Sequence, residues 1–375
     1  MSINEIFGQD KAISILQRAF TSDKMPHAYI FAGPEGVGKF KTAREWAKLL
    51  LCEKSISEKA RKLKLVDSCG TCKSCRLFDA DSHPDFNHVY KELREFTEDG
   101  KDKVTPVDLS IDVIREFLIA KAATRPTLSA RKVFVVSEAE KLNTASQNAL
   151  LKVLEEPPSY CSIILLCTRL EKLLPTTRSR CQVVRFIPIN EEKIVDKLKE
   201  MDIDAKKAQY FARLSQGSLG VARLWAQLEL ADTNLFSMKK ELVNSLSILE
   251  YANALDLAQW LLDESKKIAA AWFSLNEAAS KTDVNRRAAK TIIQIIVSAL
   301  QDAMKLKLTD PAKIINFDQK EQIEKLASRF SFELSSEKIA DCYETLRWID
   351  YSVNEKLIFE RLLLNLAVSD KMNVL

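Results

Sequence analysis

The stretch FAGPEGVGKFKTAREWAKLLLCE, residues 31–53, decides how the rest of the chain is interpreted. An apolar run enters a loop with three glycines and a lysine, which are Gly33, Gly36, Gly38 and Lys39. Glycines in this arrangement let backbone N–H groups close around phosphate oxygens at the start of a helix. The pattern G-x-x-x-x-G-K-[ST] also requires a hydroxyl after the lysine to hold magnesium. Phe40 occupies that position, so the stretch predicts a phosphate-type loop with a defective metal position.

A second defect lies at the end of a predicted neighbouring strand. Hydrolysis needs an acidic pair there, one carboxylate near the metal and one that activates water. The candidate end of the predicted strand, within KVFVVSEAEKL at 132–142, reads Ser137 and Glu138, so the first carboxylate is missing. We therefore predict that hydrolysis is lost. Backbone donors and the lysine remain, so nucleotide binding without turnover stays open, as does a plain glycine turn with a surface lysine.

Composition limits the class of protein. The chain has 375 residues, of which 46% are hydrophobic and 29% charged, as in ordinary soluble proteins of more than one domain. A net charge of +4 permits contact with nucleic acid but does not predict it. The first residues contain an early acid and no apolar core, and no apolar run approaches the roughly 20 residues that span a bilayer. We therefore expect a cytoplasmic protein with no membrane contact.

Periodicity predicts an α/β domain with a parallel sheet, followed by helices. Four apolar runs predict strands, at 27–33, 132–142, 162–168 and 181–188. The predicted α/β domain therefore ends near Ile187. After Pro188 every segment has helical period. The expected domains are an α/β domain at 1–187, a small helical domain at 188–243 and a helical collar domain at 244–375.

Four cysteines suggest a metal site. Their spacing is C-x₂-C-x₂-C with one cysteine upstream, and they are Cys52, Cys69, Cys72 and Cys75. Four thiolates suit a tetrahedral structural zinc with Zn–S bonds near 2.3 Å. An iron–sulfur cluster would want a further cysteine soon after, where the chain has Asp79. Unliganded cysteines are the remaining alternative, and the charged insert EKARKLKL, 58–65, would have to loop out for a metal site to form.

Four segments together carry a resemblance to a known family: IFGQDKAISILQRAF (6–20), PHAYIFAGPEGVGKFKTA (26–43), NALLKVLEEPP (148–158) and LPTTRSRCQVVRF (174–186). They resemble the bacterial clamp-loader subunits of the AAA+ class, and within them the delta-prime branch. The resemblance implies an AAA+ α/β domain, a small helical domain and an all-α collar. It also implies a four-cysteine zinc module at this point of the chain.

The resemblance also assigns roles to single residues. Arg180, in the triplet Ser-Arg-Cys, would be an arginine finger that acts in trans on a neighbour's nucleotide. Thr168 falls where the family has a polar sensor. The segment GSLG, 217–220, has glycine where motor subunits carry a second sensor arginine, and Arg223 follows three residues later.

The expected function is that of a non-catalytic subunit in the DNA polymerase III holoenzyme. Its partners would be ATPase subunits of the gamma/tau type, a delta-type subunit, the sliding clamp and primer–template DNA, in the cytoplasm near the nucleoid. An ATP-hydrolysing motor subunit with divergent motifs is the alternative from the enzyme class. A stand-alone zinc protein that binds nucleic acid is disfavoured by the mild charge.

Overall fold

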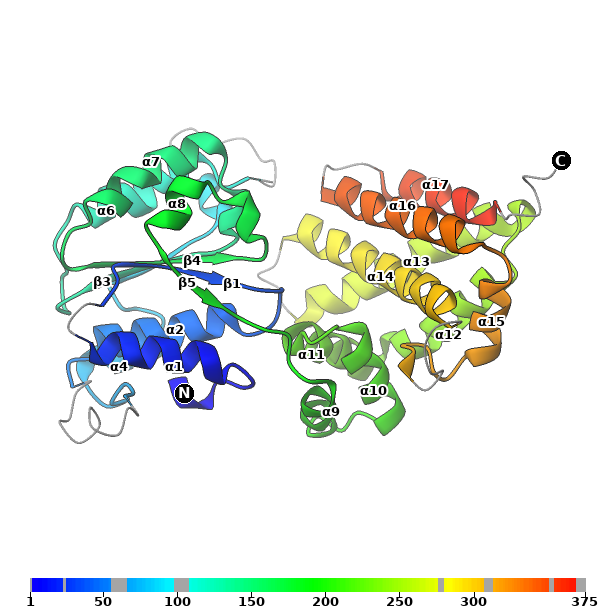
Figure 1. Ribbon diagram of the computed structural model, residues 1–375, viewed down its shortest axis with the longest axis horizontal. Coiled ribbons are helices and arrows are strands. Elements are labelled where there is room, and N and C mark those ends of the chain that lie inside the picture. The colour runs from blue at the N-terminus through cyan, green and yellow to red at the C-terminus, as the bar shows by residue number, and fades with distance from the viewer. Residues whose placement is uncertain are drawn as a thin grey trace. The chain divides into compact units, whose positions relative to one another are not determined.

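The computed structural model describes residues 2–22, 25–54, 66–97, 108–275, 280–306, 313–350 and 354–368 (Figure 1). The chain divides into two compact units. Unit 1 comprises residues 1–190 with 217–220, and unit 2 comprises 191–216 with 221–375. The three-domain division stays a prediction. The insert EKARKLKL, 58–65, lies outside the described residues.

Unit 1 contains a five-stranded parallel sheet with strand order β2-β3-β4-β1-β5. The strands are β1 (Ala28–Ala32), β2 (Phe86–Val89), β3 (Lys132–Val136), β4 (Cys161–Cys167) and β5 (Gln182–Arg185). Parallel neighbours that are distant in sequence require crossovers, and helices supply them. The predicted α/β domain with a parallel sheet is confirmed.

Helices cover both faces of this sheet, because side chains of each strand alternate between two apolar layers. In β1, Tyr29 and Phe31 join the layer under α1 (Asp10–Thr21), α2 (Lys39–Leu51) and α4 (Lys73–Asp79). In this layer Trp46 packs edge-on against Tyr29 with ring centroids 5.9 Å apart. Ala28 and Ile30 join the layer under α5 (Ile111–Ile114), α6 (Ala120–Ala122) and α7 (Thr144–Glu155). Figure 1 shows the two helical layers on either side of the sheet.

The helices of unit 1 follow the crossovers. They are α1 (Asp10–Thr21), α2 (Lys39–Leu51), α4 (Lys73–Asp79), α5 (Ile111–Ile114), α6 (Ala120–Ala122), α7 (Thr144–Glu155) and α8 (Pro175–Ser179). A π-helical turn, η3 (Arg115–Ile119), joins α5 to α6. Short 3₁₀ turns are η1 (Ile3–Glu5), η2 (Lys91–Phe96), η4 (Ala139–Lys141) and η5 (Leu170–Lys172).

Strand β2 was not predicted from the sequence. Its residues, FNHV, carry two polar side chains in four positions, and only Val89 is fully buried. The strand lies at the edge of the sheet and pairs with β3 alone. A short edge strand lacks the apolar run that identifies central strands.

Unit 2 is helical throughout its described residues, as predicted after Pro188. Its helices are α9 (Glu191–Lys199), α10 (Ala205–Leu214), α11 (Leu219–Leu228, whose first two residues belong to unit 1), α12 (Leu235–Ser247), α13 (Tyr251–Leu275), α14 (Lys281–Lys305), α15 (Lys320–Ala327), α16 (Phe332–Asp350) and α17 (Glu355–Ala367). A π-helical turn, η6 (Glu229–Thr233), follows α11.

The core of unit 2 includes a buried ion pair. Lys239 of α12 is fully buried and lies 2.5 Å from Asp318, with its ammonium over the ring of Tyr210. Burial lowers the pKa of Lys239 to about 8, although Asp318 opposes that change. None of the described helices is long and apolar enough to span a membrane.

Candidate functional site

The glycine loop, residues 33–38, joins the end of β1 to the start of α2, as predicted. Gly38 has a φ of 102° at the N-cap of α2, a left-handed conformation that glycine adopts without strain. A Cβ on Gly33 would lie only 2.4 Å from the carbonyl oxygen of Phe186. These two glycines are therefore required by the backbone, which keeps the strand–loop–helix arrangement that phosphate sites use.

Lys39 folds back onto the loop. Its Nζ donates to the carbonyl oxygens of Gly33 and Pro34, both at 2.6 Å. The lysine is mostly buried, and burial lowers its pKa while Glu140 and Glu35 act to raise it. A phosphate group would have to compete with these two carbonyls for the ammonium.

His88 contacts both residues that occupy the expected magnesium-ligand positions, Phe40 and Ser137. The ring of Phe40 lies 4.8 Å from the imidazole of His88, centroid to centroid. His88 Nε2 lies 2.8 Å from the Ser137 hydroxyl, within hydrogen-bonding distance. Burial, with a smaller contribution from Arg44, lowers the pKa of His88 to about 4, so the imidazole is neutral near pH 7. An aromatic ring, a neutral imidazole and a hydroxyl thus stand where a metal site needs a hydroxyl and a carboxylate.

Two acidic groups near the loop, Glu138 and Glu140, have partners within the chain. Glu138 has a φ of 51° and its carboxylate lies 2.6 Å from the ammonium of Lys141. The Thr168 hydroxyl donates to Glu140 at 2.5 Å, and the Thr168 backbone N–H donates to the same oxygen at 3.2 Å. The candidate sensor therefore contacts a carboxylate of its own chain.

Arg180 is held at the end of α8. Its Nη1 donates to the carbonyl oxygen of Thr176 at 2.9 Å, and its Nη2 lies 2.7 Å from Glu155 Oε1. The arginine side chain is 34% exposed. It is thus positioned by its own chain and still accessible to solvent.

The topology separates Arg180 from the glycine loop. Strands β1 and β5 are parallel neighbours in register, with Tyr29 opposite Gln182. The loop follows the end of β1, whereas Arg180 precedes the start of β5. The four residues of β5 account for roughly 13 Å of strand between them. The arginine and the loop therefore lie at opposite ends of the sheet.

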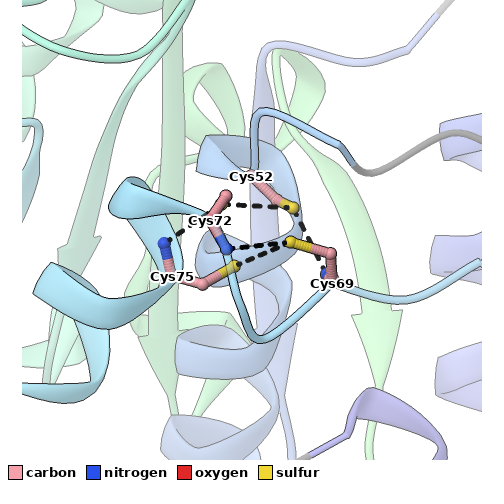
Figure 2. Close-up of side chains that lie close together, drawn as sticks. All are labelled: Cys52, Cys69, Cys72 and Cys75. Carbon is pink, nitrogen blue, oxygen red and sulfur yellow. Dashed lines mark hydrogen bonds between the residues drawn. The ribbon is translucent and has the colours of Figure 1, made fainter.

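The four predicted cysteines come together, and Figure 2 shows their side chains gathered around one point. Cys52 caps the C-terminus of α2, Cys72 caps the N-terminus of α4, and Cys75 lies in α4. All four Sγ atoms lie within 4.8 Å of one another. The sixteen intervening residues do not prevent Cys52 from joining the other three.

The spacing of the sulfur atoms fits a tetrahedral ion. Four sulfurs about 2.3 Å from a central zinc would be about 3.8 Å apart. The Cys52–Cys72 and Cys69–Cys75 separations are 3.9 and 4.0 Å. Burial acts to raise the pKa of Cys69, but hydrogen bonds from Thr71 and Cys72 outweigh it and lower that pKa to about 6. The cluster could hold a metal ion, and four thiolates are compatible with zinc.

The cysteine cluster is fixed to the rest of unit 1 by polar contacts. The Ser74 hydroxyl donates to the carbonyl oxygen of Leu51 at 2.7 Å and lies 2.9 Å from His83 Nε2. The ammonium of Lys48 in α2 lies 2.7 Å from Asp79 in α4. The buried Asp85 accepts three backbone N–H groups, from Thr127, Leu128 and Ser129.

Sequence reasoning missed the partners of the predicted residues. His88 lies on the unpredicted strand β2, and Glu140 and Glu155 lie far in sequence from Thr168 and Arg180. Glu155 stands inside the segment LEEPP, whose sequence was noticed but not its contact with Arg180. The residues DFNHVY, 85–90, do not alternate strictly between polar and apolar side chains, so periodicity gave no clear signal for His88.

Two family models match separate parts of the chain. One, described as DNA polymerase III delta subunit, matches residues 8–190, and the other, described as the C-terminal part of that subunit, matches residues 262–367. The chain belongs to the family of DNA polymerase III clamp-loader subunits. Its AAA+-type α/β unit and its helical remainder follow the fold expected from the resemblance.

Relatives of two kinds match this clamp-loader chain. The DNA polymerase III subunit delta′ of Bacillus subtilis is 27% identical over 62% of this chain and 63% of that protein. Subunit delta′ of Pseudomonas aeruginosa is 35% identical over 41% of each chain. Subunit tau of Bacillus subtilis is 30% identical over 58% of this chain and 34% of that protein. The chain thus matches between a third and two thirds of the length of these relatives.

Proposed function

We propose that the chain is a non-catalytic, delta-prime-type subunit of a clamp loader that places the sliding clamp on primed DNA. It would assemble with ATPase subunits of the gamma/tau type and a delta-type subunit, and supply Arg180 to the nucleotide of an adjoining ATPase. The proposed helical collar, residues 244–375, would join it to these partners.

One observation carries the non-catalytic part of this proposal. Phe40 packs on His88, and His88 contacts Ser137. Magnesium requires oxygen ligands in near-octahedral geometry. A phenyl ring and a neutral imidazole in that place cannot supply the hydroxyl and carboxylate that position the metal.

Turnover by the isolated chain tests this part. We expect the purified chain to release no phosphate from ATP above background, with magnesium or with EDTA. A gamma/tau-type subunit from the same organism, prepared in parallel, is the positive control. Magnesium-dependent release that persists through a final gel-filtration step would refute the non-catalytic assignment.

The arginine-finger part is supported by topology. Arg180 lies at the opposite end of the sheet from the chain's own loop, so its guanidinium is available to a neighbouring subunit rather than to its own loop. In a reconstituted complex, Arg180→Ala should leave assembly intact and lower DNA-stimulated ATP hydrolysis by roughly 10³-fold at the adjoining site. Arg180→Lys should restore little, because a point charge does not replace the planar guanidinium. Wild-type clamp loading by the alanine variant would disprove the role.

We further propose that the metal at the cysteine cluster is zinc. A four-thiolate zinc has no open position, so its contribution would be to stabilise the connection between α2 and α4. Metal analysis of protein purified without chelators should give about one zinc per chain. Iron in place of zinc would favour the cluster alternative.

A motor subunit remains the second candidate. The match to subunit tau and the retained glycines favour it. The turnover experiment above separates the two, because a motor subunit must hydrolyse ATP itself.

A further inference from the structure

The guanidinium of Arg180 is occupied on two sides by groups of its own chain. Nη2 lies 2.7 Å from Glu155 Oε1, and Nη1 donates to the carbonyl oxygen of Thr176 at 2.9 Å. These partners come from different elements, since Glu155 is the last residue of α7 and Thr176 lies in α8. Two fixed partners on two elements define the direction in which the guanidinium points.

The end of α7 favours a cation independently of that ion pair. Its last carbonyl groups carry a partial negative charge, which stabilises a positive group nearby. Glu156 follows as the C-cap residue and adds a second exposed carboxylate. Arg180 therefore lies beside Glu155 at the negative end of α7.

The ion pair is nevertheless one that another anion can displace. Glu155 and Arg180 have side chains 47% and 34% exposed, and solvent screens such pairs so that they are weak. The buried pair of Lys239 and Asp318, only 0% and 11% exposed, shows the contrasting case in the same chain. A carboxylate and a phosphate present similar paired oxygens to the planar guanidinium, so one can replace the other without moving the arginine backbone.

We propose that Glu155 is a positioning residue that holds the Arg180 guanidinium in place by an ion pair. When the subunits close, phosphate oxygens of the neighbour's nucleotide replace the Glu155 carboxylate as the partner of Arg180. The inference rests on the proposed finger role of Arg180. The exchange breaks only the contact between Glu155 and Nη2 and makes one between Nη2 and a phosphate oxygen. The bond from Nη1 to Thr176 stays in place and keeps the side chain aligned throughout.

The holding contact can be measured in the isolated chain. Phenylglyoxal modifies accessible arginines, and mass spectrometry of the peptide that contains Arg180 gives the modification rate. Glu155→Gln should raise that rate roughly two- to fivefold, the range expected from loss of an exposed ion pair. Glu156→Gln is the matched control, because it removes a neighbouring exposed carboxylate without touching the pair, and it should leave the rate unchanged. Equal rates in the wild type and Glu155→Gln would overturn the inference.

The exchange is measured in the reconstituted complex. Glu155→Gln should raise DNA-independent ATP hydrolysis roughly two- to fivefold and tighten binding of a non-hydrolysable ATP analogue by a similar factor. Neither change should occur in an Arg180→Ala background, whereas a purely structural effect of Glu155 would persist there. A Glu155→Gln effect that survives in the Arg180→Ala background would overturn the exchange.

The same experiments distinguish failure of the inference from failure of the proposed function. If Arg180→Ala alone leaves the neighbour's hydrolysis unchanged, the finger role is wrong and the exchange with it, whatever the modification rates show. If Arg180→Ala lowers hydrolysis but Glu155→Gln changes nothing in the complex, the finger role stands and the exchange is wrong.

Discussion

Replacing Phe40 by serine and Ser137 by aspartate together would put back both groups that magnesium is expected to need. We predict that this double variant still does not hydrolyse ATP. An aspartate at position 137 would lie beside His88, whose imidazole already contacts that position at 2.8 Å. The new carboxylate would therefore bind the imidazole rather than a metal, while Thr168 stays bound to Glu140.

The structure gives magnitudes for both changes. Phe40 is 39% exposed and contacts His88 through its ring, so serine should cost about 1–2 kcal/mol of unfolding free energy. A carboxylate within a few ångströms of an imidazole raises its pKa by about 1–3 units. The pKa of His88, now about 4, should therefore rise towards neutrality in Ser137→Asp.

Three measurements check these expectations. Urea denaturation gives the stability cost, with Phe40→Ala as the control that removes the ring without adding a hydroxyl. An NMR titration of His88 gives the pKa change in Ser137→Asp. Phosphate release with magnesium or EDTA gives turnover. Magnesium-dependent turnover of about 1 per second or faster, the lower end of ordinary enzyme rates, would refute the reasoning.

Three further outcomes are expected. The pKa of His88 is about 6.5 in the unfolded chain and about 4 in the folded one, so the unfolded chain binds more protons and the free energy of unfolding should fall by about 1 kcal/mol per pH unit as pH drops from about 6.5 to 4. Denaturation curves at several pH values should show a flatter slope for His88→Asn, and an unchanged slope would contradict the assignment. Cys75→Ser, at a fully buried position, should abolish stoichiometric zinc binding measured by metal analysis, whereas Cys342→Ser in unit 2 should not; full zinc content in the former would exclude this ligand set. Asp85→Asn should cost about 3 kcal/mol in urea denaturation, because an amide cannot satisfy three backbone donors as a carboxylate does; a loss below about 1 kcal/mol would show that the three bonds are not needed.

The fold was predictable where the sequence pattern is local. The central strand β4 reads as a nearly continuous apolar run, and the cysteine spacing predicted the cluster of Cys52, Cys69, Cys72 and Cys75. Strand β2 was missed because its pattern at the sheet edge is half polar. Its absence from the prediction also hid His88.

At the candidate site, contacts between segments distant in sequence could not be predicted. Phe40 and Ser137 were recognised as replacements from their motifs, but their common partner His88 depends on the order of strands in the sheet. The pair of Glu155 and Arg180 likewise joins two segments that were each recognised, and only packing of α7 on α8 brings them together. The sequence shows which residues are unusual, and tertiary structure shows which of them meet.

Helix α2 begins one residue after Gly38 and ends one residue before Cys52, so a single rigid rod of thirteen residues, about 20 Å long, spans the distance from the glycine loop to the cysteine cluster. Adding or deleting one residue would turn one end by about 100° relative to the other and shift it by about 1.5 Å. The Cys52 sulfur would then point away from its three companions, or the loop would lose its connection to β1. Substitutions on the outer face of α2 leave this geometry unchanged, whereas the number of residues in α2 is constrained by the glycine loop at its start and by Cys52 at its end. An alanine inserted near the middle of the helix thus tests the helix length alone, and it should abolish the proposed zinc binding although all four cysteines remain.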